Sequence, residues 1–153
     1  MASSAAAATG PTEEFRYPGN RLGLPEDGPG SVPTWGRRVL ALLIDWLIAG
    51  LIASALTGRP MWAGGNTYSL THSTVFFAMT AILTALLGGT IGHRVCDLRV
   101  VPVRGGQTHS VPPGILSGVV RALLISLVIP AVIFDRDRRG LHDLAARTIV
   151  VRR

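Results

Sequence analysis

The sequence predicts an all-α membrane protein with two transmembrane helices, a third apolar segment and a small β element at the cytoplasmic surface. Charged residues almost avoid three windows, about residues 39–56, 73–92 and 115–134, and arginines flank these windows. A run of about 18 or more apolar residues is long enough to cross the hydrocarbon core. A soluble helical bundle is the alternative, but its helices are usually shorter and carry polar stripes. We therefore expect the lipid bilayer to be the main partner.

The 15 basic residues of the 153-residue chain are all arginine and leave a net charge of +6. Such an excess also occurs in nucleic-acid-binding proteins. Here the arginines lie beside the apolar windows, where the positive-inside rule already explains them. We therefore expect a multi-pass protein of the cell membrane that binds no nucleic acid and has its N-terminus in the cytoplasm.

The first residues differ in composition from the rest of the chain. Residues 1–35 are rich in alanine, serine, proline and glycine, and they can bury too little apolar surface to offset the entropy of ordering. We expect a disordered cytoplasmic tail here and a membrane domain over residues 36–153. Trp35, Arg37 and Arg38 mark the interface where the first helix enters the membrane.

The segments between the windows alternate in charge. Residues 58–72 hold one arginine, as expected of an external loop, whereas residues 93–104 are arginine-rich and expected in the cytoplasm. Residues 98–104 and 148–151 are β-branched runs that we expect to pair as a small cytoplasmic sheet. Pro102 would then lie at an edge or a bulge.

The third window, residues 115–134, conflicts with this charge pattern. A full span would place the six arginines of residues 136–153 outside the cell. Arg121 and Pro130 interrupt the window, so it could instead enter and leave the same face as a re-entrant or interfacial hairpin. Both layouts stay open, and we favour the hairpin.

Small side chains lie on one face of each of the first two helices, and small residues let helix backbones approach closely in membranes. In the first helix a carboxylate joins this face, which consists of Ala41, Asp45, Ala49 and Ala53. The second face ends in a Gly-x-x-x-Gly step and includes Ala85, Gly88 and Gly92. We expect the two faces to meet, so that Asp45 points into the protein.

Three further ionisable groups accompany Asp45. Arg38 precedes it by two helical turns, about 10 Å along the axis, which is too far for a direct salt bridge. Arg121 is either the counter-ion of Asp45 or snorkels to the cytoplasmic surface. Asp143 either anchors the C-terminal tail by a charge-assisted pair or is a solvated acid. An intramembrane carboxylate has either a functional role or an assembly role, and both stay open for Asp45.

Motifs for a metal, a cofactor or catalysis are weak. His93 and Cys96 have one metal-like spacing, but a zinc site needs three or four ligands, so we expect no metal and no cofactor. The sequence has no Ser-His-Asp order, phosphate-binding glycine loop or paired carboxylates. We therefore do not expect an enzyme.

Several short motifs together resemble the RDD family of bacterial membrane proteins, named for one arginine and two aspartates. They are Arg38-x-x-Ala41-x-x-Ile44-Asp45, Thr90-Ile91-Gly92-His93-Arg94, Leu98-Arg99-Val100-Val101 and Leu141-His142-Asp143-Leu144-Ala145-Ala146. The resemblance identifies Arg38, Asp45 and Asp143 as the residues of the family name. His93 stands where lysine is commoner in the family, and Asp97 where the family usually has glycine.

Two functions follow as expectations. The resemblance implies transport of an unidentified ligand, in which Asp45 would bind or relay a cation or proton while Arg38 or Arg121 tunes its charge. A monomer with two or three spans encloses no pore, so this role requires a homo-oligomer. The alternative is an accessory or assembly subunit that docks through its small-residue faces onto itself or onto a larger membrane complex.

Overall fold

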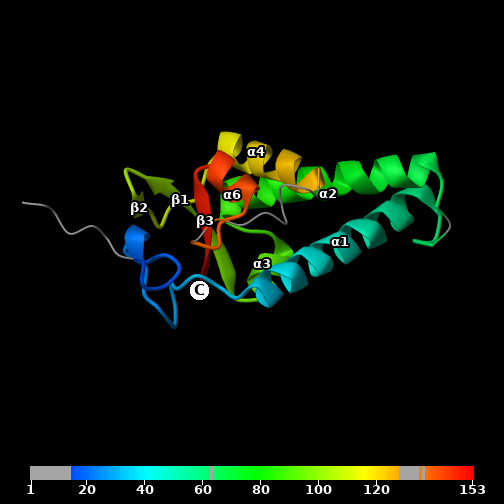
Figure 1. The fold of residues 1–153 in the computed structure, drawn as a ribbon. Helices are drawn as coiled ribbons and strands as arrows, with labels where there is room; N and C mark the ends of the chain where they lie inside the picture. Colours follow the sequence, from blue (N-terminus) through cyan, green and yellow to red (C-terminus); the bar gives the residue numbers. More distant parts are fainter. Residues whose placement is uncertain (1–14, 63, 128–134, 136) are drawn as a thin grey trace, which may run out of the picture.

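The computed structural model of the chain describes residues 15–62, 64–127, 135 and 137–153. Two long antiparallel helices, α1 (Trp35–Thr57) and α2 (Asn66–Leu87), give the molecule its elongated shape (Figure 1). Both are long and apolar enough to cross a membrane, and only 28% of the most apolar window of each is buried inside the protein. The core helix of a soluble protein is mostly buried, so the exposed apolar surface of these helices agrees with lipid contact.

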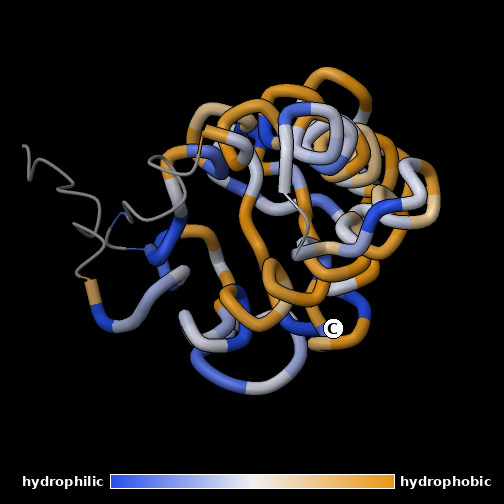
Figure 2. Tube along the Cα trace, turned by 90° about the vertical axis from the view of Figure 1, so that its right-hand side faces the viewer, coloured by the Kyte–Doolittle hydropathy of each residue, from blue (hydrophilic) through white to orange (hydrophobic). Residues whose placement is uncertain are grey.

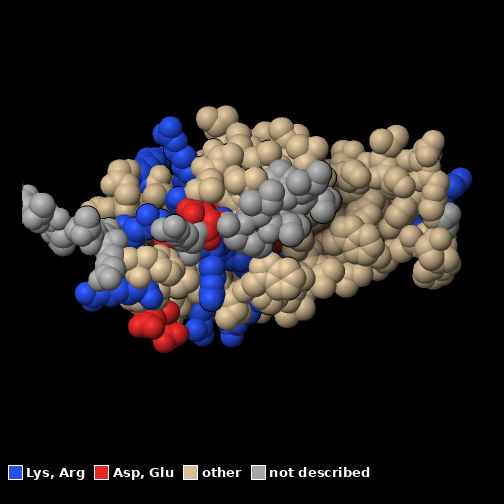
Figure 3. All heavy atoms as spheres, viewed as in Figure 1, with Lys and Arg blue, Asp and Glu red and all other residues tan. Residues whose placement is uncertain are grey.

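The two ends of the molecule differ in their chemistry. Charged side chains gather at the end where α1 begins and the strands lie, whereas the surface over the two long helices is largely uncharged (Figure 3). Seen along the long axis, apolar residues, in orange, make up much of the helical part (Figure 2). This is the division expected of a membrane-embedded helical body with a polar sheet at one membrane surface.

A three-stranded antiparallel sheet forms the polar end, with strand order β2-β1-β3. Its strands are β1 (Leu98–Arg104), β2 (Gln107–Thr108) and β3 (Thr148–Arg152). The predicted pairing of the two β-branched runs is confirmed, with Val100 opposite Val150. Pro102 lies in the central strand, at the end of the β1–β3 ladder and before the β1–β2 ladder begins, where the lack of an N–H costs little.

The two faces of the sheet bury different segments. Successive strand residues point to opposite faces, so each face carries alternate side chains. One face packs on α1 and α3 (Ile91–Val95) through a cluster of Ala41, Cys96, Leu98, Val100 and Val150. The other face packs on the segment that precedes α1 through a cluster of Leu24, Val101, Ile149 and Val151.

The structure differs here from the disordered tail predicted for residues 1–35. Residues 1–14 lie outside the described residues, but the remainder includes the short 3-10 helix η1 (Asn20–Leu22) and pairs with the sheet. Gly30 donates a backbone hydrogen bond to Arg152 and Ser31 accepts one from it, each 2.9 Å long. The segment thereby satisfies the backbone of the free edge of β3, which composition alone does not predict.

The third apolar window begins with a short helix, α4 (Ile115–Ser126). Its 12 residues correspond to about 18 Å, less than the roughly 30 Å of a hydrocarbon core. The part of the window over residues 128–134 lies outside the described residues. Beyond it, Asp137 accepts a hydrogen bond from the backbone of Gly19 at 3.1 Å, so the chain is again at the sheet end, as in the hairpin layout.

The predicted contact between the two small-residue faces is found at Gly92, which packs on α1, but not at Ala81, Ala85 and Gly88. On α2, Ala81 and Ala85 contact α4, where a Cβ on Gly118 would lie 2.7 Å from the Ala81 carbonyl oxygen and 2.9 Å from the Ala85 Cβ. Gly88 ends α2 in the left-handed conformation at φ 67°, beside the carbonyl oxygen of Val100 rather than beside α1.

The small face of α1 meets two different partners. Near the sheet, Ala41 contacts Gly92 of α3 so closely that a Cβ on this glycine would overlap the Ala41 carbonyl oxygen. Further along, Ala49 is fully buried in a cluster with Phe76 and Ile125, and Ala53 is also fully buried. The face on α1 is therefore used within the chain, against Gly92 near the sheet and against α2 further along, while α4 packs mainly on α2.

Candidate functional site

A fully buried carboxylate, Asp143, lies where the sheet meets the helices. It belongs to α6 (Leu141–Ala145), a short helix just before β3, and it accepts a hydrogen bond from the backbone N–H of Gly140 at 3.3 Å. A buried charge strongly destabilises a protein unless it is paired. The partners of Asp143 therefore decide what it does.

The first partner is Arg38, in the first turn of α1. Its guanidinium forms an ion pair with Oδ2 of Asp143 at 3.0 Å and donates a second hydrogen bond to the carbonyl oxygen of Val150 at 3.3 Å. The side chain of Arg38 is only 10% exposed. One side chain thus connects α1 with both α6 and β3.

The second partner is Arg121 of α4, which pairs with Oδ1 of the same carboxylate. It is buried, so it does not snorkel to the surface, and its ion pair is with Asp143 rather than with Asp45. Two guanidinium groups therefore share one carboxylate, which leaves an excess of positive charge. The Nε atoms of Arg38 and Arg121 are buried without a hydrogen-bond partner among the described residues.

The other buried carboxylate, Asp45, belongs to a neighbouring cluster. Its Oδ1 accepts the backbone N–H of Gly92 at 2.8 Å, and its Oδ2 accepts the hydroxyl of Thr90. Thr90 is the N-cap of α3, so Asp45 holds the start of this short helix against α1. The close approach requires a glycine at position 92, because a Cβ there would lie 2.9 Å from Cγ of Asp45.

A hydrogen-bonded chain continues from Asp45 to His93. The Thr90 hydroxyl lies 2.6 Å from Nδ1 of His93, and that nitrogen is 3.9 Å from Oδ2 of Asp45. The hydroxyl has a single proton, so its donation to Asp45 requires a protonated Nδ1 that donates to Thr90. The Nε2 atom of His93 is then an acceptor.

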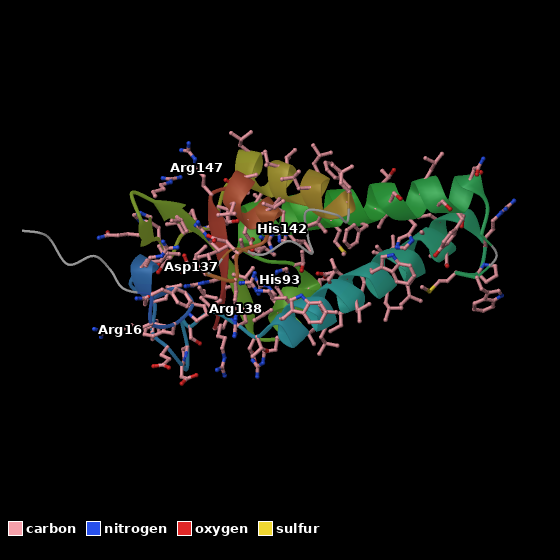
Figure 4. All side chains as sticks on the ribbon, in the orientation of Figure 1. Arg16, His93, Asp137, Arg138, His142 and Arg147 are labelled. Atoms are coloured by element: carbon pink, nitrogen blue, oxygen red, sulfur yellow. The ribbon has the colours of Figure 1, made fainter. Side chains whose placement is uncertain are left out.

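Burial and, to a smaller extent, the positive charges of Arg121 and Arg38 together lower the pKa of His93 to about 3. The imidazole is therefore neutral near pH 7. His93 and His142 are labelled at the junction of the sheet and the long helices in Figure 4, and both line the same cavity. Within the described part of the chain, no three His, Cys, Asp or Glu side chains gather as a metal site.

An open cavity of about 620 Å³ lies beside the two clusters, between α1, α2 and α4. This volume falls in the range of small-molecule sites. The cavity wall is mostly apolar, with Arg38, Arg121, His93 and His142 at the sheet end and His72 beside Trp46 further along. The described residues that line it are Trp35, Arg38, Val39, Leu42, Leu43, Trp46, His72, Ser73, Phe76, His93, Arg121, Ile125, Ser126, His142 and Val150.

The structure brings together three of the four acidic and basic residues that the sequence singled out. Arg38 and Asp143 form one cluster with Arg121, and Asp45 lies in the adjacent cluster. Sequence reasoning missed Thr90 as the group that joins Asp45 to α3. A threonine directly before a helical turn is an N-cap signal, and it could have been found in the sequence.

Comparisons with known proteins agree with the motifs. A family model described as the RDD family matches residues 32–147, which contain all three residues of the family name. The uncharacterized membrane protein YteJ of Bacillus subtilis (strain 168) is 31% identical over 126 residues, which cover 74% of this chain and 77% of YteJ. No solved structure matches the chain significantly.

Proposed function

The chain belongs to the RDD family of membrane proteins, and from this premise we propose that it is a non-catalytic, multi-pass protein of the cell membrane that binds an anionic ligand in the cavity between α1, α2 and α4. The observation that supports this most is the composition of the cavity wall. Arg38 and Arg121 line the cavity, whereas neither Asp45 nor Asp143 does. A ligand therefore meets positive charge without an opposing carboxylate.

The ion cluster makes this site rigid before any ligand binds. Asp143 holds both guanidinium groups, so little side-chain entropy is lost when an anion arrives. Hydrogen bonds between guanidinium groups and carboxylate or phosphate oxygens are among the strongest in proteins.

The orientation in the membrane follows from charge. We place the arginine-rich sheet end in the cytoplasm, together with the N-terminus, because cytoplasmic segments carry the excess of arginine. The cavity then lies in the cytoplasmic half of the bilayer.

Tryptophan fluorescence tests the proposed function, because Trp35 and Trp46 line the cavity. The probes are sn-glycerol 3-phosphate and dodecyl phosphate, added to the full chain in micelles of the neutral detergent dodecyl maltoside. We expect a saturable change with at least one phosphate. Arg121→Gln should lower the affinity for the phosphate about tenfold, because one charge-assisted hydrogen bond is lost. Arg94→Gln, at an exposed position outside the cavity, is the matched control. No saturable change with either phosphate would contradict the proposal.

Proton-linked transport is a second candidate, supported by the chain from Asp45 through Thr90 to His93. This chain runs from a buried carboxylate to a residue of the cavity wall. Neutral imidazole and hydroxyl groups in such a line can pass a proton by exchanging donor and acceptor roles. Proton flux into vesicles that contain the reconstituted protein tests this role.

Assembly as a homo-oligomer, or as an accessory subunit of a larger membrane complex, is a third candidate. Its support is weaker, because Ala41, Ala49 and Ala53, the residues expected to dock onto a partner, are fully buried within the single chain. The mass of the native particle in a mild detergent tests it directly.

A further inference from the structure

We propose that the ligand of the cavity is one anionic phospholipid, with its phosphate at Arg38 and Arg121 and one acyl chain along α1 toward Trp46. The inference rests on the anion-binding function proposed above and names the ligand class. It is carried by the polarity, the length and the opening of the cavity.

The polarity of the wall matches that of an amphiphile. At the sheet end the cavity presents the two guanidinium groups and the neutral imidazole of His93. The remaining wall is mainly aliphatic and aromatic, with Val39, Leu42, Leu43, Trp46, Phe76 and Ile125. A small soluble anion would leave this apolar wall in contact with water, whereas an acyl chain would cover it.

The length of the cavity matches one leaflet. Trp35 at the start of α1 and Trp46 both line the cavity. Their separation of 11 positions corresponds to about 16 Å of helix, close to half of a hydrocarbon core of roughly 30 Å. A lipid in its usual orientation, with the phosphate at the membrane surface, therefore spans the cavity from end to end.

The cavity opens toward the membrane. Two of its wall residues on α1, Leu43 and Trp46, are 52% and 49% exposed on the apolar surface of that helix. A lipid can thus enter sideways without passing through water. Large contiguous apolar patches, unlike single exposed apolar residues, are rare on soluble proteins unless they contact a partner or a membrane.

The charges select the headgroup. A phosphodiester can accept hydrogen bonds from guanidinium groups, and those of Arg38 and Arg121 belong to the residues that line the cavity. A zwitterionic lipid carries the same phosphate but adds an ammonium group, which Arg38 and Arg121 repel. We therefore expect preference for phosphatidylglycerol over phosphatidylcholine.

The test measures lipid binding to the full chain in dodecyl maltoside by tryptophan fluorescence and by native mass spectrometry. Phosphatidylglycerol should bind saturably and remain on the protein as one molecule per chain. Phosphatidylcholine should bind about tenfold more weakly, the effect of one unfavourable charge. At the same concentration, sn-glycerol 3-phosphate should have no effect.

Two variants locate the lipid. Ser73→Phe places a bulky ring in the cavity and should abolish retention of phosphatidylglycerol, whereas Thr74→Phe, at an exposed neighbouring position outside the cavity wall, should not. Arg121→Gln should remove the preference for the anionic lipid, and Asp143 keeps Arg38 as a partner in this variant. Size-exclusion chromatography confirms that each variant is folded.

The outcomes separate this inference from the proposed function. Equal binding of both lipids would overturn the headgroup assignment, and retention by Ser73→Phe would place the lipid outside the cavity. If sn-glycerol 3-phosphate binds as well as the lipid, the anion site stands and the lipid assignment falls. If no phosphate compound binds, both fall.

Discussion

Arg38 and Asp143 lie 105 residues apart in the sequence, yet they form an ion pair of 3.0 Å in which the carboxylate is fully buried. The pair joins the first helix to the segment before the last strand, and Arg121 occupies the other carboxylate oxygen. A buried carboxylate between two guanidinium groups is stable only while its partners remain. The same contacts that fix the C-terminal segment therefore also hold two positive groups at the cavity wall.

Asp143→Asn should be strongly destabilising. The change leaves Arg38 and Arg121 buried without a counter-charge, and breaking a buried ion pair typically lowers the free energy of unfolding by about 3–5 kcal/mol. Unfolding in mixed micelles with increasing denaturing detergent measures this. Asp97→Asn, at an exposed position, is the matched control and should change the free energy by less than about 0.5 kcal/mol. Equal effects of the two variants would contradict a central role for the cluster.

Sequence patterns predicted the helices and the sheet because both depend on local chemistry. Long apolar windows bounded by arginine predict α1 and α2, and β-branched runs predict β1 and β3. The packing partners were not predictable in the same way. Gly118 of α4 takes the face of α2 that was assigned to α1, because small-residue faces specify close contact but not which helix supplies it.

Gly92→Ala should separate α3 from α1. An added Cβ would overlap the carbonyl oxygen of Ala41 and lie 2.9 Å from Cγ of Asp45. Overpacking of this kind typically costs about 1–3 kcal/mol, which should appear as a lower unfolding temperature. Gly36→Ala is the control, because no heavy atom lies within 4 Å of its Cβ position. If both variants unfold at the wild-type temperature, the close contact between α1 and α3 is wrong.

The candidate site was only partly predictable. The resemblance picked out Arg38 and Asp143, but their pairing depends on the fold and on residues more than 100 positions apart. The backbone conformation of Asp97, by contrast, can be related to its residue type. This residue adopts the left-handed conformation at φ 54°, which aspartate tolerates and which would suit the glycine that the resemblance implies at this position.

The stability of the protein should depend on His93 at acidic pH. Its folded pKa of about 3 lies below the unfolded value near 6.5, so the unfolded state binds the proton more readily. This contribution to stability is complete above about pH 6.5 and is lost as the pH falls toward 3. Over that range the free energy of unfolding falls by at most about 1.4 kcal/mol per pH unit. Unfolding temperatures between pH 7 and pH 5 should fall less in His93→Asn than in the wild type. His109→Asn, at an exposed position, should keep the wild-type profile.

Thiol labelling should reveal both sides of the membrane. In a Cys96→Ala background, a cysteine at Asn66, in the loop end of α2, should react with a membrane-impermeant maleimide added to intact cells. Cysteines at Gln107 and Arg153, both exposed at the sheet end, should react only after the cells are opened. Labelling of Arg153→Cys but not Gln107→Cys in intact cells would show that the third window spans the membrane.

Asp45 separates ligand binding from proton transport, because both of its oxygens have identified partners. Asn at this position can still accept the backbone N–H of Gly92, and its amide can donate to Thr90, which then donates to His93. We therefore expect Asp45→Asn to keep the fold and the binding of dodecyl phosphate. Asp45→Leu leaves the backbone N–H of Gly92 buried without a partner, at a cost of about 1–3 kcal/mol, and should lose both the fold and the binding. Asparagine cannot ionise and so cannot carry a proton. If Asp45 only holds α3 in place, vesicles with the wild type and vesicles with Asp45→Asn should therefore show the same proton flux. A flux present in the wild type and absent in a folded Asp45→Asn would instead establish the carboxylate as a proton carrier and make transport the function of the cavity.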